Sequence, residues 1–276
     1  MIEKHNSAST AMTALETLMA RLRGPEGCPW DRKQTPQSLL PYTIEEAYEV
    51  AEAVETHNTA SWKDELGDLL FHVVFHSRIA AEEGAFTLSD VITGIVDKMT
   101  RRHPHVFAPD GETLHQPEQV VSQWEEIKRQ EKSATQGPPS LFDDVNSHLP
   151  ALLWAAKVQR KMSQVGFDWD GPEGVMEKVR EELEELRVAP TPDNREEELG
   201  DLLLTIVNLA GHYRINPEMA LRRATRKVQA RFRHMESRLR ENDRTPTDAS
   251  LDELEALWQE SKIIIATPAT APGTAP

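Results

Sequence analysis

The sequence lacks several features that mark extracellular and membrane proteins. A single cysteine, Cys28, excludes any intrachain disulfide and is typical of a reducing compartment. The longest apolar runs, such as residues 202–207, are far too short to span a bilayer. Residues 1–10 are polar and lack the apolar core of a secretory signal. We therefore expect a soluble, cytoplasmic protein with no membrane partner.

Positive charge is also scarce. The 276 residues include 31 Lys and Arg against 46 Asp and Glu, which gives a formal net charge of -15. Such an excess of negative charge disfavours sustained contact with nucleic-acid backbones. We therefore expect no nucleic-acid polymer as partner, whereas a small anionic ligand stays compatible if a metal ion and a few local cations bind it.

Part of the acidic excess follows one pattern that occurs twice. Glu-Glu-Ala-Tyr-Glu at residues 45–49 precedes Glu-Leu-Gly-Asp at 65–68, and Glu-Glu-Leu-Glu-Glu at 181–185 precedes Glu-Leu-Gly-Asp at 198–201. Helical residues three or four apart share a face, so the carboxylates of each copy converge if the two helices pack antiparallel. Converging carboxylates repel one another, and a hard divalent cation relieves that repulsion. The pattern predicts a Mg²⁺ site in each half, with Mn²⁺ as the alternative metal.

The two halves match beyond the carboxylates. Segments 28–31, 62–70, 98–102 and Trp124 have counterparts in the same order at 167–170, 195–203, 227–231 and Trp258. This order predicts two tandem domains, residues 10–132 and 150–265, joined by a linker at 133–149. Residues 266–276 form a low-complexity tail that we expect to be disordered.

Apolar spacing predicts helices along the whole chain. Apolar residues recur three or four apart in segments such as 15–22 and 92–99, and Ser250 with Glu253 forms a helix-starting capping box. No segment shows the sustained two-residue alternation of a half-buried strand. The acidic helices continue into apolar runs, so they belong in a bundle core. We predict an all-α fold of two tandem helical bundles.

The two carboxylate pairs, a downstream Lys/Arg helix and a late Trp together resemble the MazG family of nucleoside triphosphate pyrophosphohydrolases. The pattern of the wider all-α NTP pyrophosphatase superfamily is Glu-Glu-x-x-Glu, a spacer, then Glu-x-x-Asp, and residues 45–68 and 181–201 both fit it. Segments 27–31, 42–46 and 101–107 also look like stretches typical of two-domain MazG proteins. The resemblance covers nearly the whole chain, except the first few residues and the tail.

The resemblance implies an enzyme, a Mg²⁺-dependent nucleoside triphosphate diphosphatase that converts NTPs and dNTPs to monophosphates and pyrophosphate. It implies ATP among the ligands, broad base specificity, a housekeeping role in the nucleotide pool and assembly into a homodimer or higher homo-oligomer. The preferred base and sugar and the phosphorus attacked stay open.

Carried over residue by residue, the resemblance implies two sets of metal ligands. They are Glu46, Glu49, Glu65 and Asp68 in the first half and Glu182, Glu185, Glu198 and Asp201 in the second. The implied substrate contacts are Lys178, Lys227, Arg231 and Trp258, with Lys98, Arg102 and Trp124 in the first half. Glu181, Glu182, Glu45 and Glu46 are the catalytic candidates, since a carboxylate not fully used as a ligand can orient the attacking water or take its proton.

Plainer interpretations compete with these roles. Helical Glu is usually solvated surface, but Asp68 and Asp201 each lead into an apolar run, which that interpretation explains poorly. The Lys/Arg pairs also suit the C-terminal half of a helix dipole, and Trp124 and Trp258 also suit packing. A di-iron bundle is disfavoured, since its Glu-x-x-His string occurs only in a Gly/Pro-flanked connection at 112–115. A non-hydrolytic nucleotide- or partner-binding helical module stays as the alternative function.

The two predicted sites are not equivalent. After Asp68 the first half has His72 and Phe75, where the second half has Thr205 and Asn208. Thr and Asn can both hydrogen-bond water or a sugar hydroxyl. We therefore predict that the second half is the main hydrolase.

Overall fold

The structure is a computed structural model that describes residues 7–108, 116–117, 119–120, 123–124, 126–127, 131 and 140–265. These described residues form helices and no strands, so the all-α prediction is confirmed. Within them, no helix is both long and apolar enough to cross a membrane. The predicted disordered tail, the string at 112–115 and residues 133–139 of the predicted linker lie outside the described residues.

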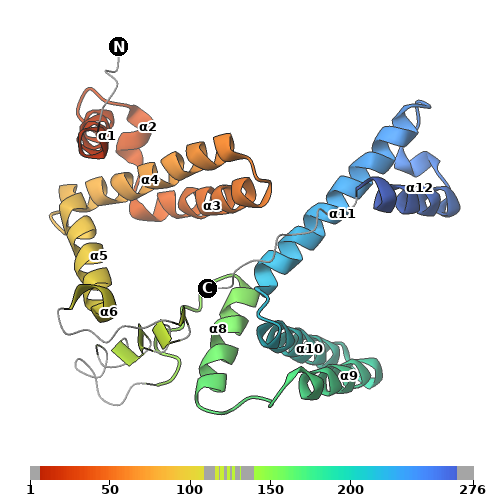
Figure 1. Cartoon of the computed structure of the whole chain (residues 1–276). Coiled ribbons are helices and arrows are strands. Elements are labelled where there is room, and N and C mark those ends of the chain that lie inside the picture. Colours follow the sequence, from red (N-terminus) through yellow and green to blue (C-terminus); the bar gives the residue numbers. More distant parts are fainter. Residues whose placement is uncertain are drawn as a thin grey trace. The chain divides into compact units, whose positions relative to one another are not determined.

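The chain divides into two compact units, residues 1–128 and 129–276 (Figure 1). The described helices of the first unit are α1 (Ala8–Leu22), α2 (Pro29–Lys33), α3 (Pro36–Glu55), α4 (Thr59–Glu82), α5 (Leu88–Arg102) and α6 (Pro104–Phe107). Those of the second unit are α8 (Ala151–Gln164), α9 (Pro172–Val188), α10 (Pro192–His212), α11 (Pro217–Arg240), the 3-10 helix η1 (Pro246–Asp248) and α12 (Leu251–Ile264). The bounds of our two domains stay a prediction.

Capping side chains fix where the acidic helices of the first unit begin. The Thr35 hydroxyl accepts from the Ser38 backbone N–H, and the Ser38 hydroxyl accepts in return from the Thr35 N–H, which starts α3. Asn58 starts α4 by accepting from the Ser61 N–H. α3 and α4 then lie side by side, joined by a short turn (Figure 1).

The core of the first unit lies where α1 and α3 pack on α4. Its buried apolar residues are Met19, Leu39, Val74, Phe75, Ile79 and Leu88. Phe75 is 1% exposed and is among the largest fully buried side chains of the described residues. Close packing of this kind holds α3 and α4 in the register that brings their polar faces together.

The second unit repeats the paired-helix arrangement. α9 lies against α10, α8 packs on α10, and α12 packs along the distal part of α11 (Figure 1). Thr191 and Asn216 cap α10 and α11 by accepting from backbone N–H groups. Ser250 accepts from the Glu253 N–H at the start of α12, so the predicted helix start there is confirmed.

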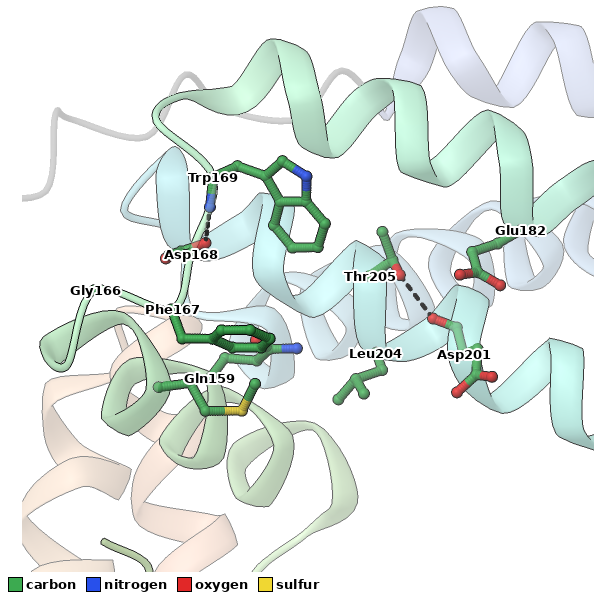
Figure 2. A pocket seen from close by; sticks show the side chains of 10 residues that line it. Gln159, Gly166, Phe167, Asp168, Trp169, Glu182, Asp201, Leu204 and Thr205 are labelled. Carbon is green, nitrogen blue, oxygen red and sulfur yellow. Dashed lines mark hydrogen bonds between the residues drawn. The ribbon is translucent and has the colours of Figure 1, made fainter.

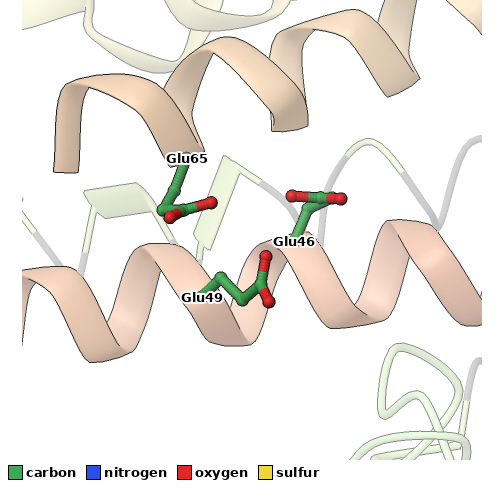
Figure 3. A group of neighbouring side chains, drawn as sticks. All are labelled: Glu46, Glu49 and Glu65. Carbon is green, nitrogen blue, oxygen red and sulfur yellow. The ribbon is translucent and has the colours of Figure 1, made fainter. Parts of the chain in front are cut away.

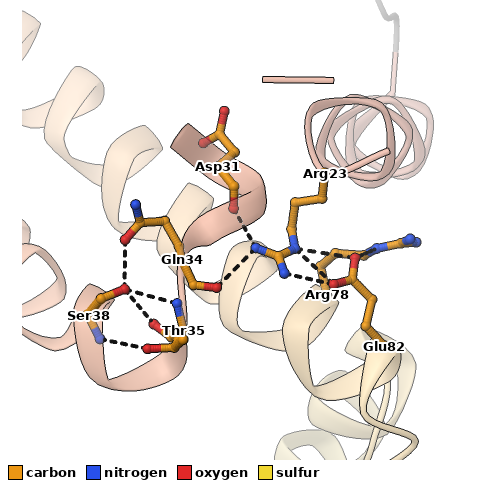
Figure 4. Close-up of polar contacts among 7 residues, drawn as sticks. All are labelled: Arg23, Asp31, Gln34, Thr35, Ser38, Arg78 and Glu82. Atoms are coloured by element: carbon orange, nitrogen blue, oxygen red, sulfur yellow. Dashed lines mark hydrogen bonds and ion pairs between the residues drawn. The ribbon is translucent and has the colours of Figure 1, made fainter. Parts of the chain in front are cut away.

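A buried arginine connects α1, α2 and α4 in the first unit (Figure 4). The Arg23 side chain is 7% exposed, and its Nη2 donates to Glu82 Oε2 at 2.7 Å. Its Nη1 donates to the backbone oxygens of Asp31 at 2.5 Å and Gln34 at 3.3 Å. One guanidinium therefore anchors the C-terminal half of the short α2 segment to α4.

Candidate functional site

Three carboxylates of the first unit meet across the α3/α4 pair. Glu46 and Glu49 project from α3 and Glu65 from α4, and each offers an oxygen such that all three lie within 4.8 Å of one another (Figure 3). The spacing of three on α3 places both of its carboxylates on one face, as the sequence predicted. The arrangement confirms that the two acidic segments converge.

Burial and mutual repulsion shape the electrostatics of this cluster. Burial raises the pKa of Glu46, and the charges of Glu49, Asp68 and Glu65 raise it further. The pKa of Glu65 is raised as well, first by burial and then by the charges of Glu49 and Asp68. Glu46 Oε2 is buried without a hydrogen-bond partner among the described residues. Crowded carboxylates with an unpaired buried oxygen are the donor set that a hard divalent cation fits.

The second unit contains the same cluster on α9 and α10. Oxygens of Glu182, Glu185 and Glu198 lie within 4.8 Å of one another. Burial raises the pKa of Glu198, and the charges of Glu185, Glu182 and Asp201 add to the increase. Glu182 is 4% exposed, and within the described chain its Oε2 has no hydrogen-bond partner. Asp201 and its counterpart Asp68 therefore add charge to each cluster from just outside the closest triplet.

A lysine distinguishes the second cluster from the first. Lys178 Nζ lies 2.9 Å from Glu182 Oε1 and 2.7 Å from Glu181 Oε1. Hydrogen bonds to Glu181 and then to Glu182 raise the pKa of Lys178, so it stays charged. The residue four positions before Glu46 in the first unit is Tyr42. The second cluster therefore includes a fixed positive charge that the corresponding position of the first unit does not supply.

Two histidines, His72 and His76, lie beside the acidic cluster of the first unit. His72 Nε2 lies 3.9 Å from Glu46 Oε1, and the Thr43 hydroxyl lies 3.1 Å from His72 Nδ1 and 3.0 Å from His76 Nε2. Burial, followed by the neighbouring His76, lowers the pKa of His72. The imidazole is therefore neutral at pH 7 and does not neutralise Glu46.

A pocket of about 420 Å³ opens beside the acidic cluster of the second unit (Figure 2). In Figure 2, Phe167 and Trp169 lie on one side of the pocket and the carboxylates of Glu182 and Asp201 on the other. The remaining lining residues are Gln159, Met162, Gly166, Asp168, Leu204 and Thr205. The pocket therefore joins an aromatic region to a carboxylate region.

Two glycines allow the aromatic side chains to reach the pocket. Gly166 has a φ of +81°, a left-handed conformation that ends α8, and the next residue's N–H donates to the Met162 oxygen at 3.0 Å. A Cβ built on Gly174 would lie 2.7 Å from Trp169 Cδ1. Glycine at that position therefore leaves space for the indole ring.

A polar network that the sequence reading missed lies behind the aromatic side chains. Asp168 Oδ1 accepts from Asn208 Nδ2 at 3.1 Å and from the Trp169 N–H at 2.9 Å, and lies 3.2 Å from His212 Nε2. Asn208 Nδ2 also donates to Gln159 Oε1 at 3.2 Å. Burial pushes the pKa of Asp168 upward, but the hydrogen bonds led by Asn208 hold that pKa below its ordinary value. Asp168 is therefore an ionised acceptor.

Three predicted substrate contacts of the second unit lie elsewhere on it. Lys227 and Arg231 are on α11, and Trp258 is on α12. The Arg231 guanidinium lies 5.6 Å from the centroid of the Trp258 ring. Of the described residues that line the pocket, none belongs to α11 or α12. The structure thus brings Arg231 and Trp258 together without placing them in the pocket of their own unit.

The remaining predicted residues are spread over the first unit. Lys98 is exposed on α5, which also carries Arg102, and the Trp124 ring lies 5.7 Å from the His103 ring. Glu45 is exposed on α3, beside the cluster but outside its triplet. The roles of these residues stay predictions.

Comparison with known proteins adds a second line of observation. The family model described as the MazG nucleotide pyrophosphohydrolase domain matches residues 34–107. The nucleoside triphosphate pyrophosphohydrolase/pyrophosphatase MazG of Thermotoga maritima is 47% identical over 248 residues, 90% of this chain and 94% of that protein. The nucleoside triphosphate pyrophosphohydrolase of Escherichia coli K12 is 42% identical over 254 residues, 90% of this chain and 95% of that protein. A solved MazG-related protein from Thermotoga maritima is 29% identical with a TM-score of 0.36, covering 43% of this chain and 98% of that one.

Proposed function

This chain belongs to the MazG family, and from that premise we propose that it is a nucleoside triphosphate pyrophosphohydrolase that holds its substrate in the pocket of the second unit. The observation that carries the proposal is the joining of Phe167 and Trp169 to the acidic cluster within one pocket of about 420 Å³. That volume lies in the usual range of small-molecule sites. An aromatic region suits a nucleobase, and the carboxylate region suits a cation-bound polyphosphate.

The metal proposed for both clusters is Mg²⁺, with Mn²⁺ as the alternative. Its ligands would be the Glu182, Glu185 and Glu198 oxygens with Asp201 beside them, and the matching four residues of the first unit. The fit rests on the all-oxygen donor set and on the buried Oε2 atoms of Glu46 and Glu182, which have no hydrogen-bond partner in the described part of the chain. When bound, the cation supplies the positive charge that lets phosphate oxygens approach these carboxylates.

The chain's own residues would orient the reactants. Glu181 is the candidate to orient the attacking water or to take its proton. The Lys178 ammonium group lies 2.7 Å from Glu181 Oε1 and holds this carboxylate in place. The same lysine fixes Glu182 at the edge of the pocket. Phe167 and Trp169 would hold the base by stacking, which gives affinity to every base and so supports broad specificity over NTPs and dNTPs, ATP included.

The active form that we propose is a homodimer. Helices α4 and α10 expose several large apolar residues, and three on each helix lie three or four positions apart. They are Leu66, Leu70 and Val73 on α4, at 45, 39 and 40% exposure, and Leu199, Leu203 and Ile206 on α10, at 47, 47 and 44%. Exposed apolar faces of this kind mark association sites. Because Lys227, Arg231 and Trp258 do not line their own pocket, a second copy is the proposed source of these triphosphate contacts.

The proposed division of labour makes the second unit the main hydrolase. It rests on the pocket beside the second cluster and on Phe75, which fills the core of the first unit where Asn208 stands in the second. A housekeeping role in the cytoplasmic nucleotide pool is the matching biological proposal, and the single cysteine supports that compartment.

Separate inactivation of the two clusters tests the proposal. Pyrophosphate and nucleoside monophosphate are measured from a panel of NTPs and dNTPs with Mg²⁺. We expect Glu185→Gln/Asp201→Asn to abolish most release, because it removes carboxylates that bind the cation, and Glu49→Gln/Asp68→Asn to retain most of it. Full release by a variant with both clusters altered would exclude the proposed chemistry, and the reversed pattern would move the main site to the first unit.

A further inference from the structure

The side-chain amide of Gln159 has an orientation that its neighbours impose. Asp168 is an ionised acceptor, so the Asn208 group that faces it at 3.1 Å must be the NH₂ and not the oxygen. The same NH₂ faces Gln159 at 3.2 Å, so the Gln159 group on that side must be its oxygen. The NH₂ of Gln159 is therefore directed away from Asn208, in a residue that lines the pocket.

This orientation leaves a buried group unpaired. Asn208 is 4% exposed, and among the described residues its Oδ1 has no hydrogen-bond partner although it is buried. An unpaired buried acceptor destabilises a fold, and an apolar residue would avoid it. The first unit has such a residue, because Phe75 takes the corresponding position in its core. The second unit thus keeps a costly polar residue, which is typical of a functional position.

The lining of the pocket makes the Gln159 donor distinctive. Asp168, Glu182 and Asp201 can only accept hydrogen bonds when ionised. The Thr205 hydroxyl already donates to the Asp201 backbone oxygen at 2.9 Å. The described side chains of the pocket thus offer N–H donors from the Gln159 amide and the Trp169 indole.

We propose that Gln159 discriminates between nucleobases, by donating from Nε2 to a carbonyl oxygen of the base held by Phe167 and Trp169. The inference rests on the proposed function, namely that this pocket binds the nucleoside triphosphate. A base with an oxo group at pyrimidine C4 or purine C6 accepts this hydrogen bond, whereas an amino group there only donates. Stacking admits every base, and Gln159 ranks oxo bases above their amino counterparts. Asn208 and Asp168 are positioning residues that act through Gln159.

Two matched substrate pairs test the proposal, UTP against CTP and ITP against ATP, which contrast oxo with amino groups at these positions. We expect the unaltered chain to favour the oxo member of each pair by about tenfold in kcat/KM. Gln159→Glu should invert the ratio, because a carboxylate still accepts from Asn208 but presents only acceptors to the base. Gln159→Met should bring the ratio near one. Asn208→Leu should do the same with Gln159 still present, since the amide is then free to turn.

The controls separate this inference from the proposed function. Gln37→Glu makes the same chemical change at an exposed position of the first unit and should leave both ratios unchanged. Calorimetric binding of UMP and CMP measures the same preference without turnover. An absence of hydrolysis would contradict the proposed function, but the ratio of the two dissociation constants could still be measured. Equal binding and turnover of oxo and amino members by the unaltered chain, or a ratio unchanged in Gln159→Glu, would overturn the assignment of Gln159.

Discussion

Lys178 lies 2.9 Å from Glu182 in the second unit, whereas Tyr42 holds the corresponding position of the first. The lysine lowers the negative charge that its cluster presents to a cation. His72 does not do this for Glu46, because burial keeps the imidazole neutral. Single residues outside the acidic motifs therefore give two clusters of the same carboxylates different net charge.

Removal of the lysine charge should strengthen cation binding at the second cluster. We expect Lys178→Gln to bind Mg²⁺ about tenfold more tightly, since site charge tunes the affinity of carboxylate sites. Calorimetric titration with Mg²⁺ measures the change in a chain whose first cluster carries Glu49→Gln/Asp68→Asn. Lys157→Gln, at an exposed position of α8, is the matched control. Weaker binding in Lys178→Gln would mean that the lysine acts chiefly by orienting Glu182.

The ion pair of Arg23 with Glu82 should make the first unit sensitive to acid. The hydrogen bond from Arg23 is the main reason that the pKa of Glu82 lies below its ordinary value. Because folding lowers this pKa, its stabilisation is complete above the ordinary value and disappears as the pH falls through the lowered one. Glu82→Gln should therefore weaken α1 and α4 at pH 7 and reduce the loss of stability as the pH falls below the ordinary pKa of a glutamate.

Hydrogen exchange of the α1 and α4 amides over that pH range measures this effect within one unit. Glu83→Gln, at the neighbouring exposed position, should keep the pH dependence of the unaltered chain. The same acid sensitivity in Glu82→Gln as in the unaltered chain would show that other carboxylates are responsible.

At the scale of helices, local signals predicted the elements and their ends well. The helix start at Ser250, the acidic spacing on α3 and the apolar run after Asp68 act over a few residues, so the sequence displays them directly. The convergence of both acidic triplets followed from helical spacing and from one assumption, that the helices pair.

Contacts between residues that are far apart in the chain could not be predicted from the sequence. Arg23 meets Glu82 59 positions away, and Asn208 meets Gln159 49 positions away and Asp168 40 positions away. No local spacing encodes such contacts, because tertiary packing creates them. The position of Arg231 and Trp258 outside the pocket depends in the same way on the direction that α11 takes.

A side chain at Gly174, in the first turn of α9, should displace Trp169 and weaken substrate binding. A Cβ there lies 2.7 Å from Trp169 Cδ1, so Gly174→Ala forces the indole to move and should raise the KM for every NTP several-fold. Steady-state kinetics at saturating Mg²⁺ measures it. Gly211→Ala in α10 is the control, since a Cβ there meets nothing within 4 Å and helix propensity improves by about 1 kcal/mol. An unchanged KM in Gly174→Ala would mean that Trp169 does not contact the substrate.

At the scale of the whole molecule, we expect the exposed apolar faces of α4 and α10 to decide between a monomer and a dimer. Leu203, at 47% exposure, lies in the middle of the α10 face. We expect a dimeric mass by light scattering at micromolar concentration, and Leu203→Glu should shift it to the monomer and lower the activity, because burying a charge in an apolar interface is unfavourable.

Leu251→Glu is the comparison, because Leu251 is 81% exposed at the start of α12 and lies outside both apolar faces. That variant should keep the dimeric mass. A monomeric mass for the unaltered chain with full activity would contradict the homodimer.

The contrast between Phe75 and Asn208 has an evolutionary consequence. A chain with one acidic cluster must preserve every residue that its reaction uses, even one that weakens the fold. A chain with two copies is free of that constraint in one of them. The first copy holds a buried aromatic ring at this position, whereas the second holds an amide oxygen that is buried without a partner among the described residues. Redundancy within a single gene thus lets stability and selectivity be improved by separate mutations, each in its own half.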